Sequence, residues 1–184
     1  MKLLSWGAKV AYNIRGAVYR ALILLSGGAC GPRLRVERGL RFRHGIHRGI
    51  SIGRSVYLGC GTIIDCPEGG ALVIGNDVTL THGVFISAAS RVAIGDDTLI
   101  GEYVSIRDAD HAIALDGGPI RSQPMIAHGI DIGPDVWIGR GVAVLSGATL
   151  ERGCVIGANA VVKGTIGAGQ IAVGIPARPV RARA

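Results

Sequence analysis

The sequence predicts an all-β solenoid, in which short parallel strands stack into coils around one aliphatic core. The first observation behind this prediction is a six-residue repeat of Ile, Leu or Val along most of the chain. The second is the composition of the 184 residues, with 30 glycines, 48% hydrophobic residues and only 4% aromatic ones. Such a composition favours thin, regular layers over an aromatic-filled interior.

The repeat covers fifteen positions, each of them aliphatic: Ile52, Leu58, Ile64, Ile74, Leu80, Ile86, Ile94, Ile100, Ile106, Ile132, Ile138, Val144, Leu150, Ile156 and Val162. The residue four places after each is usually small or β-branched, so it shares a strand face with the next aliphatic residue. Three units then make one triangular coil, and stacked coils bury a continuous column. An amphipathic helix would repeat at 3.6 residues instead. Glycine directly follows eight of the fifteen positions, and we expect it to supply a positive φ at the turn.

The repeat is interrupted after Ile64, Ile86 and Ile106, and each interruption follows a third unit. All three insertions are therefore expected at the same corner of the prism. The longest, about residues 107–125, is polar and contains two glycines and two prolines. It is a loop on a rigid scaffold, which is where functional residues often lie.

An N-terminal helix is predicted for residues 2–26 by apolar residues at helical spacing: Leu3, Val10, Ile14, Ala17, Ala21 and Leu25. Lys9, Arg15 and Arg20 flank this stripe, and two glycines end it. We favour a helix that caps the first coil and hides its sheet edge. The alternative is a basic amphipathic helix in peripheral contact with the anionic inner face of a membrane. The expected organisation is thus a helical segment at 1–30, a solenoid at 31–175 and a basic tail at 176–184.

The net charge of +7 favours an anionic partner: a phosphate-bearing cofactor, a membrane surface or nucleic acid. Nucleic acid is disfavoured, because the basic stretch 33–48 has no aromatic residue besides Phe42 and a solenoid offers no groove-reading element. The four cysteines lack metal-site spacing and suggest free thiols in a reducing compartment. No apolar run is long enough to span a bilayer. We therefore expect a cytoplasmic protein.

From about Gly49 to Arg181 the chain resembles the hexapeptide-repeat acyltransferases, whose signature is [LIV]-G-x-x-[STAV]-x. Within that family, VWIGRGVAVLSGATLERGCVIGANAVV followed by AVGIPARPVR is similar to the maltose, galactoside and polysaccharide O-acetyltransferases. The resemblance implies a left-handed parallel β-helix of about five to six coils and a homotrimer with active sites between subunits. It also implies acetyl transfer from acetyl-CoA to a hydroxyl, for which we prefer a sugar in surface-polysaccharide synthesis.

The candidate general base is His111, in the loop sequence SIRDADHAIALDGG. Transfer of an acyl group from a thioester to a hydroxyl requires removal of the hydroxyl proton, and an imidazole titrates in the useful range. Asp108 and Asp110 are near in sequence, and either could orient the imidazole. The resemblance also implies a catalytic histidine here. With no cysteine near His111 in sequence, we expect direct attack within a ternary complex.

The resemblance assigns the remaining site residues by matching motif. The coenzyme A groove is expected to involve Trp137, Gly139, Arg140, Ala158, Lys163, Arg178 and Arg181. Small residues suit the narrow pantetheine arm, and arginines offer forked donors to phosphates. Thr81 and His82 are expected at the acceptor; Thr81 stands where related enzymes commonly carry an asparagine.

Two other functions remain as alternatives. An N-acetyltransferase acting on an amino sugar or an antibiotic would use the same donor machinery. A zinc protein of the γ-carbonic-anhydrase type shares the fold but needs a second histidine near the first. Asp116 stands five residues after His111, so we expect no metal.

Overall fold

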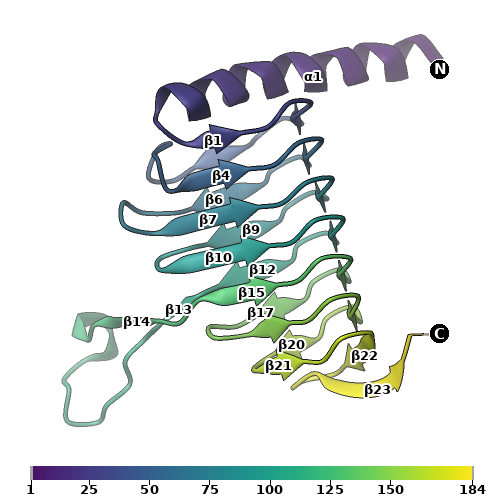
Figure 1. Ribbon diagram of the computed structural model, residues 1–184. Helices are drawn as coiled ribbons and strands as arrows, with labels where there is room; N and C mark the ends of the chain where they lie inside the picture. The colour runs from purple at the N-terminus through teal and green to yellow at the C-terminus, as the bar shows by residue number, and fades with distance from the viewer. Residues whose placement is uncertain (1, 184) are drawn as a thin grey trace.

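The computed structural model describes residues 2–183 and has the shape of a triangular prism with a helix across one end (Figure 1). Three sheets of short strands form the sides of the prism. The chain runs along the first, second and third sheet in turn and then starts the next coil. Within residues 2–183 it completes six coils and begins a seventh. The predicted parallel solenoid is confirmed.

The strands of each sheet, in stacking order, have the following bounds. Sheet A contains β1 (Ala29–Cys30), β4 (Ile50–Ile52), β7 (Ala71–Ile74), β10 (Arg91–Ile94), β15 (Ile130–Ile132), β18 (Thr149–Leu150) and β21 (Thr165–Ile166). Sheet B contains β2 (Arg35–Val36), β5 (Tyr57–Leu58), β8 (Thr79–Leu80), β11 (Leu99–Ile100), β16 (Trp137–Ile138), β19 (Val155–Ile156), β22 (Gln170–Val173) and β23 (Arg178–Ala182). Sheet C contains β3 (Arg41–Phe42), β6 (Ile63–Asp65), β9 (Phe85–Ser87), β12 (Ser105–Arg107), β17 (Ala143–Val144) and β20 (Val161–Val162). Neighbouring strands within these sheets are parallel, except that the basic tail returns as β23 antiparallel to β22.

The core is a column of aligned aliphatic side chains. In sheet A, for example, Ile74 is in register with Ile52 of the coil before it and with Ile94 of the coil after it. All fifteen repeat positions are buried, none with more than 3% of its surface exposed. The register also extends one coil further back than the aliphatic repeat, because Cys30 and Val36 pair with Ile52 and Leu58.

The eight glycines that directly follow an aliphatic repeat position have a different cause from the one predicted. These glycines do not have a positive φ; the left-handed residues fall elsewhere in each turn, as at Ser55 and Tyr103. Instead, the backbone of the next coil passes directly over them. A Cβ placed on Gly139 would lie 2.8 Å from the backbone nitrogen of Ala158. The expectation of a positive φ was therefore wrong, and close backbone approach explains the glycines.

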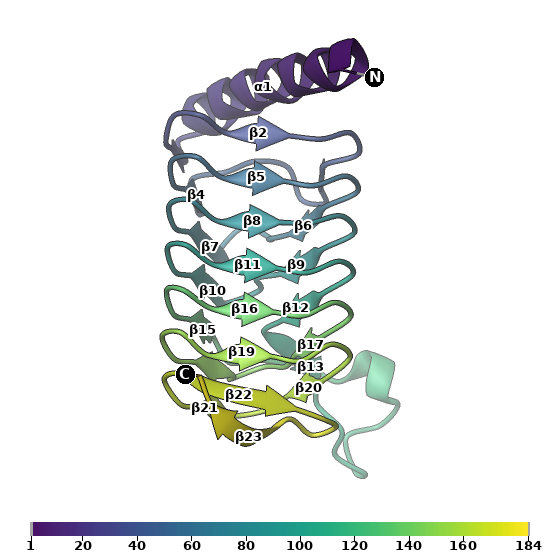
Figure 2. The ribbon, with the colours of Figure 1, turned by 90° about the vertical axis from the view of Figure 1, so that its right-hand side faces the viewer.

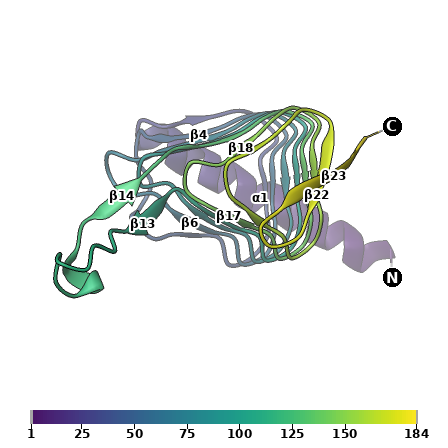
Figure 3. The ribbon, with the colours of Figure 1, turned by 90° about the horizontal axis from the view of Figure 1, so that it is seen from below.

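The three insertions emerge at one corner, between sheet C and sheet A, as predicted. The longest connects β12 to β15 and forms an antiparallel hairpin of β13 (Ala109–His111) and β14 (Met125–Ala127), with a short 3₁₀ helix, η1 (Ile120–Ser122), between them. Figure 3 shows this hairpin leaving the prism at the corner opposite sheet B.

The helix α1 (Lys2–Leu25) covers the first coil. Its packed face carries Gly16, Tyr19 and Ile23, and a Cβ on Gly16 would collide with the carbonyl of Leu34. The side chain of Leu3 lies outside the described part of the chain. The other members of the apolar stripe noted in the sequence lie on the opposite, exposed face of α1.

Candidate functional site

A groove runs along the outer face of sheet B, which faces the viewer in Figure 2. Two adjoining hollows of about 550 and 480 Å³ share Leu99, Trp137 and Val155 as lining residues. These three side chains point outward from β11, β16 and β19 at the same register position. Trp137 is 56% exposed, so its indole forms an open apolar wall in the middle of the groove.

One end of the groove lies at the corner between sheets B and C and is built largely from backbone. Gly101, Gly139 and Ala158 line it from successive coils, together with Thr81 and Arg140. Because the small residues project nothing into the space, a ligand there can approach backbone amides closely. This suits a narrow chain with amide groups, such as the pantetheine arm of coenzyme A.

The other end of the groove carries charged side chains of both signs, with arginines from β23 and from the residue that follows it. Arg181 and Arg183 line it beside Asp97 and Asp135. Arg183 is bound to Asp135 by an ion pair of 2.8 Å, whereas no ion pair is formed by Arg181 within residues 2–183. Arg181 is therefore the cation of this end that is available to a phosphate.

The structure brings six of the residues proposed from the sequence into this groove: Thr81, Trp137, Gly139, Arg140, Ala158 and Arg181. Lys163 and Arg178 do not line it. Lys163 is exposed in the turn between β20 and β21, at the corner where the hairpin emerges, and Arg178 is exposed at the start of β23. Sequence reasoning missed Leu99, Val155 and Arg183. The first two could have been found by aligning the coils, because they precede the buried repeat positions in the same register as Trp137.

His82 belongs to a small cluster beside the groove. Its ring meets that of Tyr103 edge-on, with centroids 5.1 Å apart, and the guanidinium of Arg140 lies 5.8 Å from the Tyr103 centroid. Tyr103 has φ = 57°, an unusual conformation for a bulky residue. Its ring lies where a Cβ on Gly83 would be. The Thr81 hydroxyl donates to the Ile100 carbonyl at 3.0 Å, which fixes it at the edge of the groove.

His111 ends strand β13 and is exposed on the hairpin, opposite Met125. The side chain of Asp110 points to the other face of the hairpin, because neighbouring strand residues alternate. Within residues 2–183 no side chain forms a hydrogen bond or ion pair with the imidazole. The structure therefore does not join His111 to either nearby aspartate.

Asp108 instead anchors the base of the hairpin. Its side chain is fully buried, and both carboxylate oxygens accept backbone N–H groups of the preceding insertion. Oδ1 accepts from Ala89 at 2.8 Å, and Oδ2 accepts from Ser90 at 2.7 Å and from Arg91 at 2.8 Å. Bonds of this kind to an ionised carboxylate are among the strong ones.

The backbone of Asp108 continues this anchor. Its carbonyl accepts the N–H of His128, where the loop returns, and the hydroxyl of Ser146 in the next coil, both at 2.8 Å. The start and end of the loop are thus tied together and to the prism. Inside the loop, the Gln123 amide bonds to both backbone groups of Ala114 and so closes the tip.

The cysteines offer no nucleophile near His111. Cys66 is 1% exposed, and burial raises the pKa of its thiol to about 11, which disfavours the reactive thiolate. Cys60 lies beside Tyr12 and Glu37, close to α1 rather than to the hairpin.

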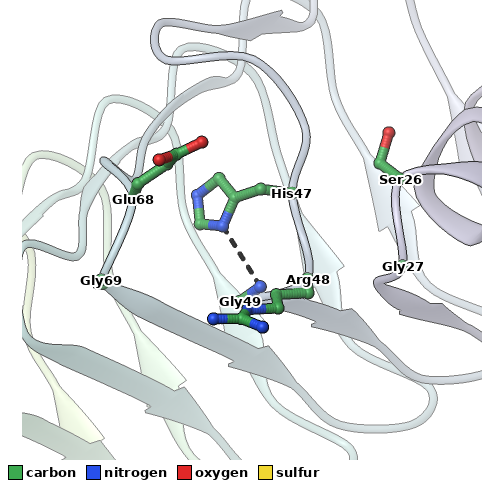
Figure 4. Close-up of a pocket in the computed structure, with 8 residues that line it drawn as sticks. Ser26, Gly27, His47, Arg48, Gly49, Glu68 and Gly69 are labelled. Atoms are coloured by element: carbon green, nitrogen blue, oxygen red, sulfur yellow. Dashed lines mark hydrogen bonds between the residues drawn. The ribbon is translucent and has the colours of Figure 1, made fainter.

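Another hollow, of about 1050 Å³, lies on the corner between sheets C and A beside the end of α1 (Figure 4). Its histidine, His47, is used by the fold. The ring accepts the Gly49 N–H through Nδ1 at 3.2 Å and contacts the Cys66 carbonyl through Nε2 at 2.8 Å. It thereby ties together the connections that lead from sheet C to sheet A in the first two coils.

His111 and the sheet B groove lie on opposite sides of one chain. The hairpin leaves the corner between sheets C and A, and the groove covers the opposite face, as Figure 3 shows. His111 and this groove therefore cannot meet within one chain without a large rearrangement.

Comparison with known proteins shows the relatives of this chain. Residues 129–164 match the family model described as bacterial transferase hexapeptide (six repeats). The chain is 41% identical over 134 residues to the probable acetyltransferase Rv3034c of Mycobacterium tuberculosis, covering 73% of this chain but only 44% of that protein. It is 31% identical over 139 residues to the putative lipopolysaccharide biosynthesis O-acetyl transferase WbbJ of Escherichia coli K12, covering 72% and 71% of the two chains.

A solved structure extends the likeness to the fold. The hexapeptide-repeat acetyltransferase VCA0836 of Vibrio cholerae, in complex with acetyl-CoA, is similar with a TM-score of 0.66 and 27% identity, over 73% of this chain and 70% of that one. The six-residue repeat, the three-sided solenoid and this set of relatives lead to one conclusion: the chain belongs to the hexapeptide-repeat acyltransferase family, whose fold is the left-handed parallel β-helix.

Proposed function

We propose that the chain is an acetyl-CoA-dependent O-acetyltransferase, and that its acceptor is a sugar hydroxyl in cytoplasmic synthesis of a surface polysaccharide. The observation that carries this proposal is the groove on sheet B, with small residues at one end, Trp137 in the middle and Arg181 at the other end. The names of the relatives support the acetyl donor, and WbbJ supports a lipopolysaccharide-type acceptor.

The working unit in this proposal is a homotrimer, in which His111 of one copy faces the groove of the next. The separation of the two features within one chain supports this arrangement. The apolar side chains of the loop support it as well, since Ile113 and Leu115 are 76% and 104% exposed. Exposed apolar residues on a projecting loop favour burial against a partner. Three copies close into a ring if each loop reaches the next groove.

The chemistry follows from these positions. The imidazole of His111 takes the proton of the acceptor hydroxyl, and the oxygen attacks the carbonyl carbon of the thioester. Hydrogen-bond donors at the groove edge stabilise the tetrahedral oxyanion. Collapse of this intermediate breaks the C–S bond, and the imidazolium returns its proton to the leaving thiolate, giving the acetyl ester and free coenzyme A. We expect Thr81, at the groove edge, and His82 beside it to contact the acceptor.

The general-base role is tested by measuring coenzyme A thiol release from acetyl-CoA across a panel of sugar and amino-sugar acceptors. His111→Ala is expected to lower kcat by about 10²- to 10⁴-fold, with acetyl-CoA binding retained. The matched control is His128→Ala, because His128 is an exposed histidine at the end of the same loop. Equal loss in both variants, or full activity of His111→Ala, contradicts the role. Transfer to amines alone would point to the N-acetyltransferase alternative.

The shared site is tested by mixing two inactive variants. One carries His111→Ala and the other carries Trp137→Ala with Arg181→Ala in the groove. If each site takes its base from one copy and its groove from the next, random mixed trimers contain about one quarter intact sites. Recovery of about that fraction of activity supports the proposal. If each site lay within one chain, mixing would restore nothing.

A further inference from the structure

The helix α1 has two faces, and only one of them is used by the prism. Gly16, Tyr19 and Ile23 pack against the first coil. The opposite face carries large apolar side chains at helical spacing. Ile14 is 60% exposed, Val18 54% and Leu25 85%. The helix lies across the end of the prism (Figure 1), and because these side chains are largely exposed, nothing in the described chain covers them.

Basic residues flank the exposed apolar face. Lys9 and Arg20 lie on one side of it and Arg15 on the other, and α1 contains no acidic residue. A helix with an apolar face and cationic flanks is the kind that lies in the plane of a membrane surface. Among the described residues no helix is long and apolar enough to cross a membrane. This helix can therefore rest on a bilayer surface but cannot span it.

The charge of the whole chain is concentrated at the same end. Residues 1–54 contain 11 basic residues and one acidic residue, a net charge of +10. Residues 55–184 contain 9 basic and 12 acidic residues, a net charge of −3. The net charge of +7 thus hides a strong polarity along the prism axis, with the positive pole at the helix.

The cations of the first coil lie at all three corners of the prism and on two of its three sides. Exposed arginines lie at the corner between sheets A and B (Arg33), on sheet B (Arg35), at the corner between sheets B and C (Arg38), on sheet C (Arg41) and at the corner between sheets C and A (Arg48). A helix is about 10 Å across, so these side chains lie close to one Debye length, about 8 Å, below the outer face of α1. These arginines therefore attract anions that lie against the outer face of α1.

From these features we propose that the helical end of the solenoid docks on an anionic lipid bilayer. The helix α1 lies in the interface with Ile14, Val18 and Leu25 among the lipids, and the arginines of the first coil contact the anionic headgroups. The charge distribution favours this occupant over a second copy of the chain, because two such ends placed face to face would repel each other. In this arrangement the prism extends from the membrane, and the groove on sheet B is open to acceptors near the membrane surface.

The test is cosedimentation of the full-length protein with sucrose-loaded vesicles of phosphatidylcholine alone or with added phosphatidylglycerol. We expect binding to the anionic vesicles that weakens as salt is raised, and little binding to neutral ones. Ile14→Ser with Val18→Ser is expected to lower the partition coefficient by at least about tenfold, because two apolar side chains no longer enter the interface. The matched control is Val73→Ser with Val180→Ser, two exposed valines away from α1, which should bind as the wild type does.

The charge contribution is tested in the same assay. Arg41→Gln with Arg48→Gln is expected to weaken binding by about 25-fold, or about fivefold for each cation near the surface. Arg121→Gln with Arg152→Gln removes the same charge from exposed positions far from α1 and should have little effect. Circular dichroism and acetyl-CoA binding of each variant verify the fold and keep this result separate from the donor site.

Three results would overturn the proposal. The wild type stays in the supernatant with anionic vesicles; the test pairs and their controls behave alike; or the Ile14 and Val18 pair abolishes self-association in sedimentation velocity while no form binds vesicles. The last result would identify a second copy as the occupant of this face.

Discussion

The buried carboxylate of Asp108 allows the sharpest test of how the hairpin that carries His111 is held. In Asp108→Asn, the amide can turn its one oxygen toward the N–H groups of Ser90 and Arg91, but its NH₂ group then faces the N–H of Ala89. One hydrogen bond to a charged acceptor is lost, and the other two now go to a neutral acceptor.

The magnitude follows from these losses. A hydrogen bond to a charged group contributes about 1.5–3 kcal/mol and one between neutral groups about 1 kcal/mol, so loss of one bond and weakening of two predict a cost of about 3–6 kcal/mol. For a chain of this size the melting temperature changes by about 2–4 °C per kcal/mol, so it should fall by about 10 °C or more. The control is Asp110→Asn, because Asp110 is exposed two residues further on. That variant should stay within about 0.5 kcal/mol of the wild type.

The assay is thermal unfolding of both variants, followed by circular dichroism, with hydrogen exchange of residues 88–91 and 108–128 as the local measurement. Asp108→Asn should lose protection in both segments, and kcat should fall more than acetyl-CoA affinity, because the base is displaced while the groove stays intact. Equal melting temperatures for the two variants would refute the anchoring role.

Three further predictions concern other parts of the chain. Gly139→Ala should destabilise by about 1–3 kcal/mol in urea unfolding, since its Cβ would meet the next coil, whereas Gly7→Ala on open helix surface should be neutral or stabilising by up to about 1 kcal/mol; equal effects would contradict the close-approach explanation. The hydrogen bond from Tyr57 holds the pKa of Glu37 below its ordinary value of 4.5. The stabilisation of the fold by ionised Glu37 is therefore present above that value and is lost as the pH falls through the lowered pKa. Tyr57→Phe should reduce this loss in thermal melts from pH 6 to about 3, and a pH profile equal to that of the wild type would contradict the prediction. Leu115→Ser should weaken oligomerisation in analytical ultracentrifugation without changing the circular dichroism spectrum, and an unaltered oligomer would count against the loop as an interface.

The solenoid could be predicted from the sequence because each six-residue unit repeats the same physical requirement. An aliphatic residue fills the column, and glycine admits the next coil. The first coil escaped this pattern because two of its core positions hold Cys30 and Phe42 rather than aliphatic residues, although their six-residue spacing from Val36 is intact. Searching for the spacing with any apolar residue would have found it.

The candidate site was less accessible to sequence reasoning, because it depends on which side of each coil a residue faces. Matching motifs placed Trp137, Gly139 and Arg181 in one groove. The proposed pairing of Asp108 with His111 does not form, although the two residues are close in sequence. The Asp108 side chain instead turns into the prism and accepts backbone N–H groups. Periodicity also could not show which face of α1 packs, since both faces of that helix are largely apolar.

The most direct test of the central claim is calorimetric titration of acetyl-CoA into the wild type, Trp137→Ala and His111→Ala. The account predicts micromolar binding that is weakened about tenfold or more by loss of Trp137 and that survives loss of His111. The melting temperature of Trp137→Ala should be unchanged, because the indole is more than half exposed. Absence of acetyl-CoA binding to the wild type, or binding that Trp137→Ala leaves intact, would contradict the assignment of the sheet B groove as the donor site.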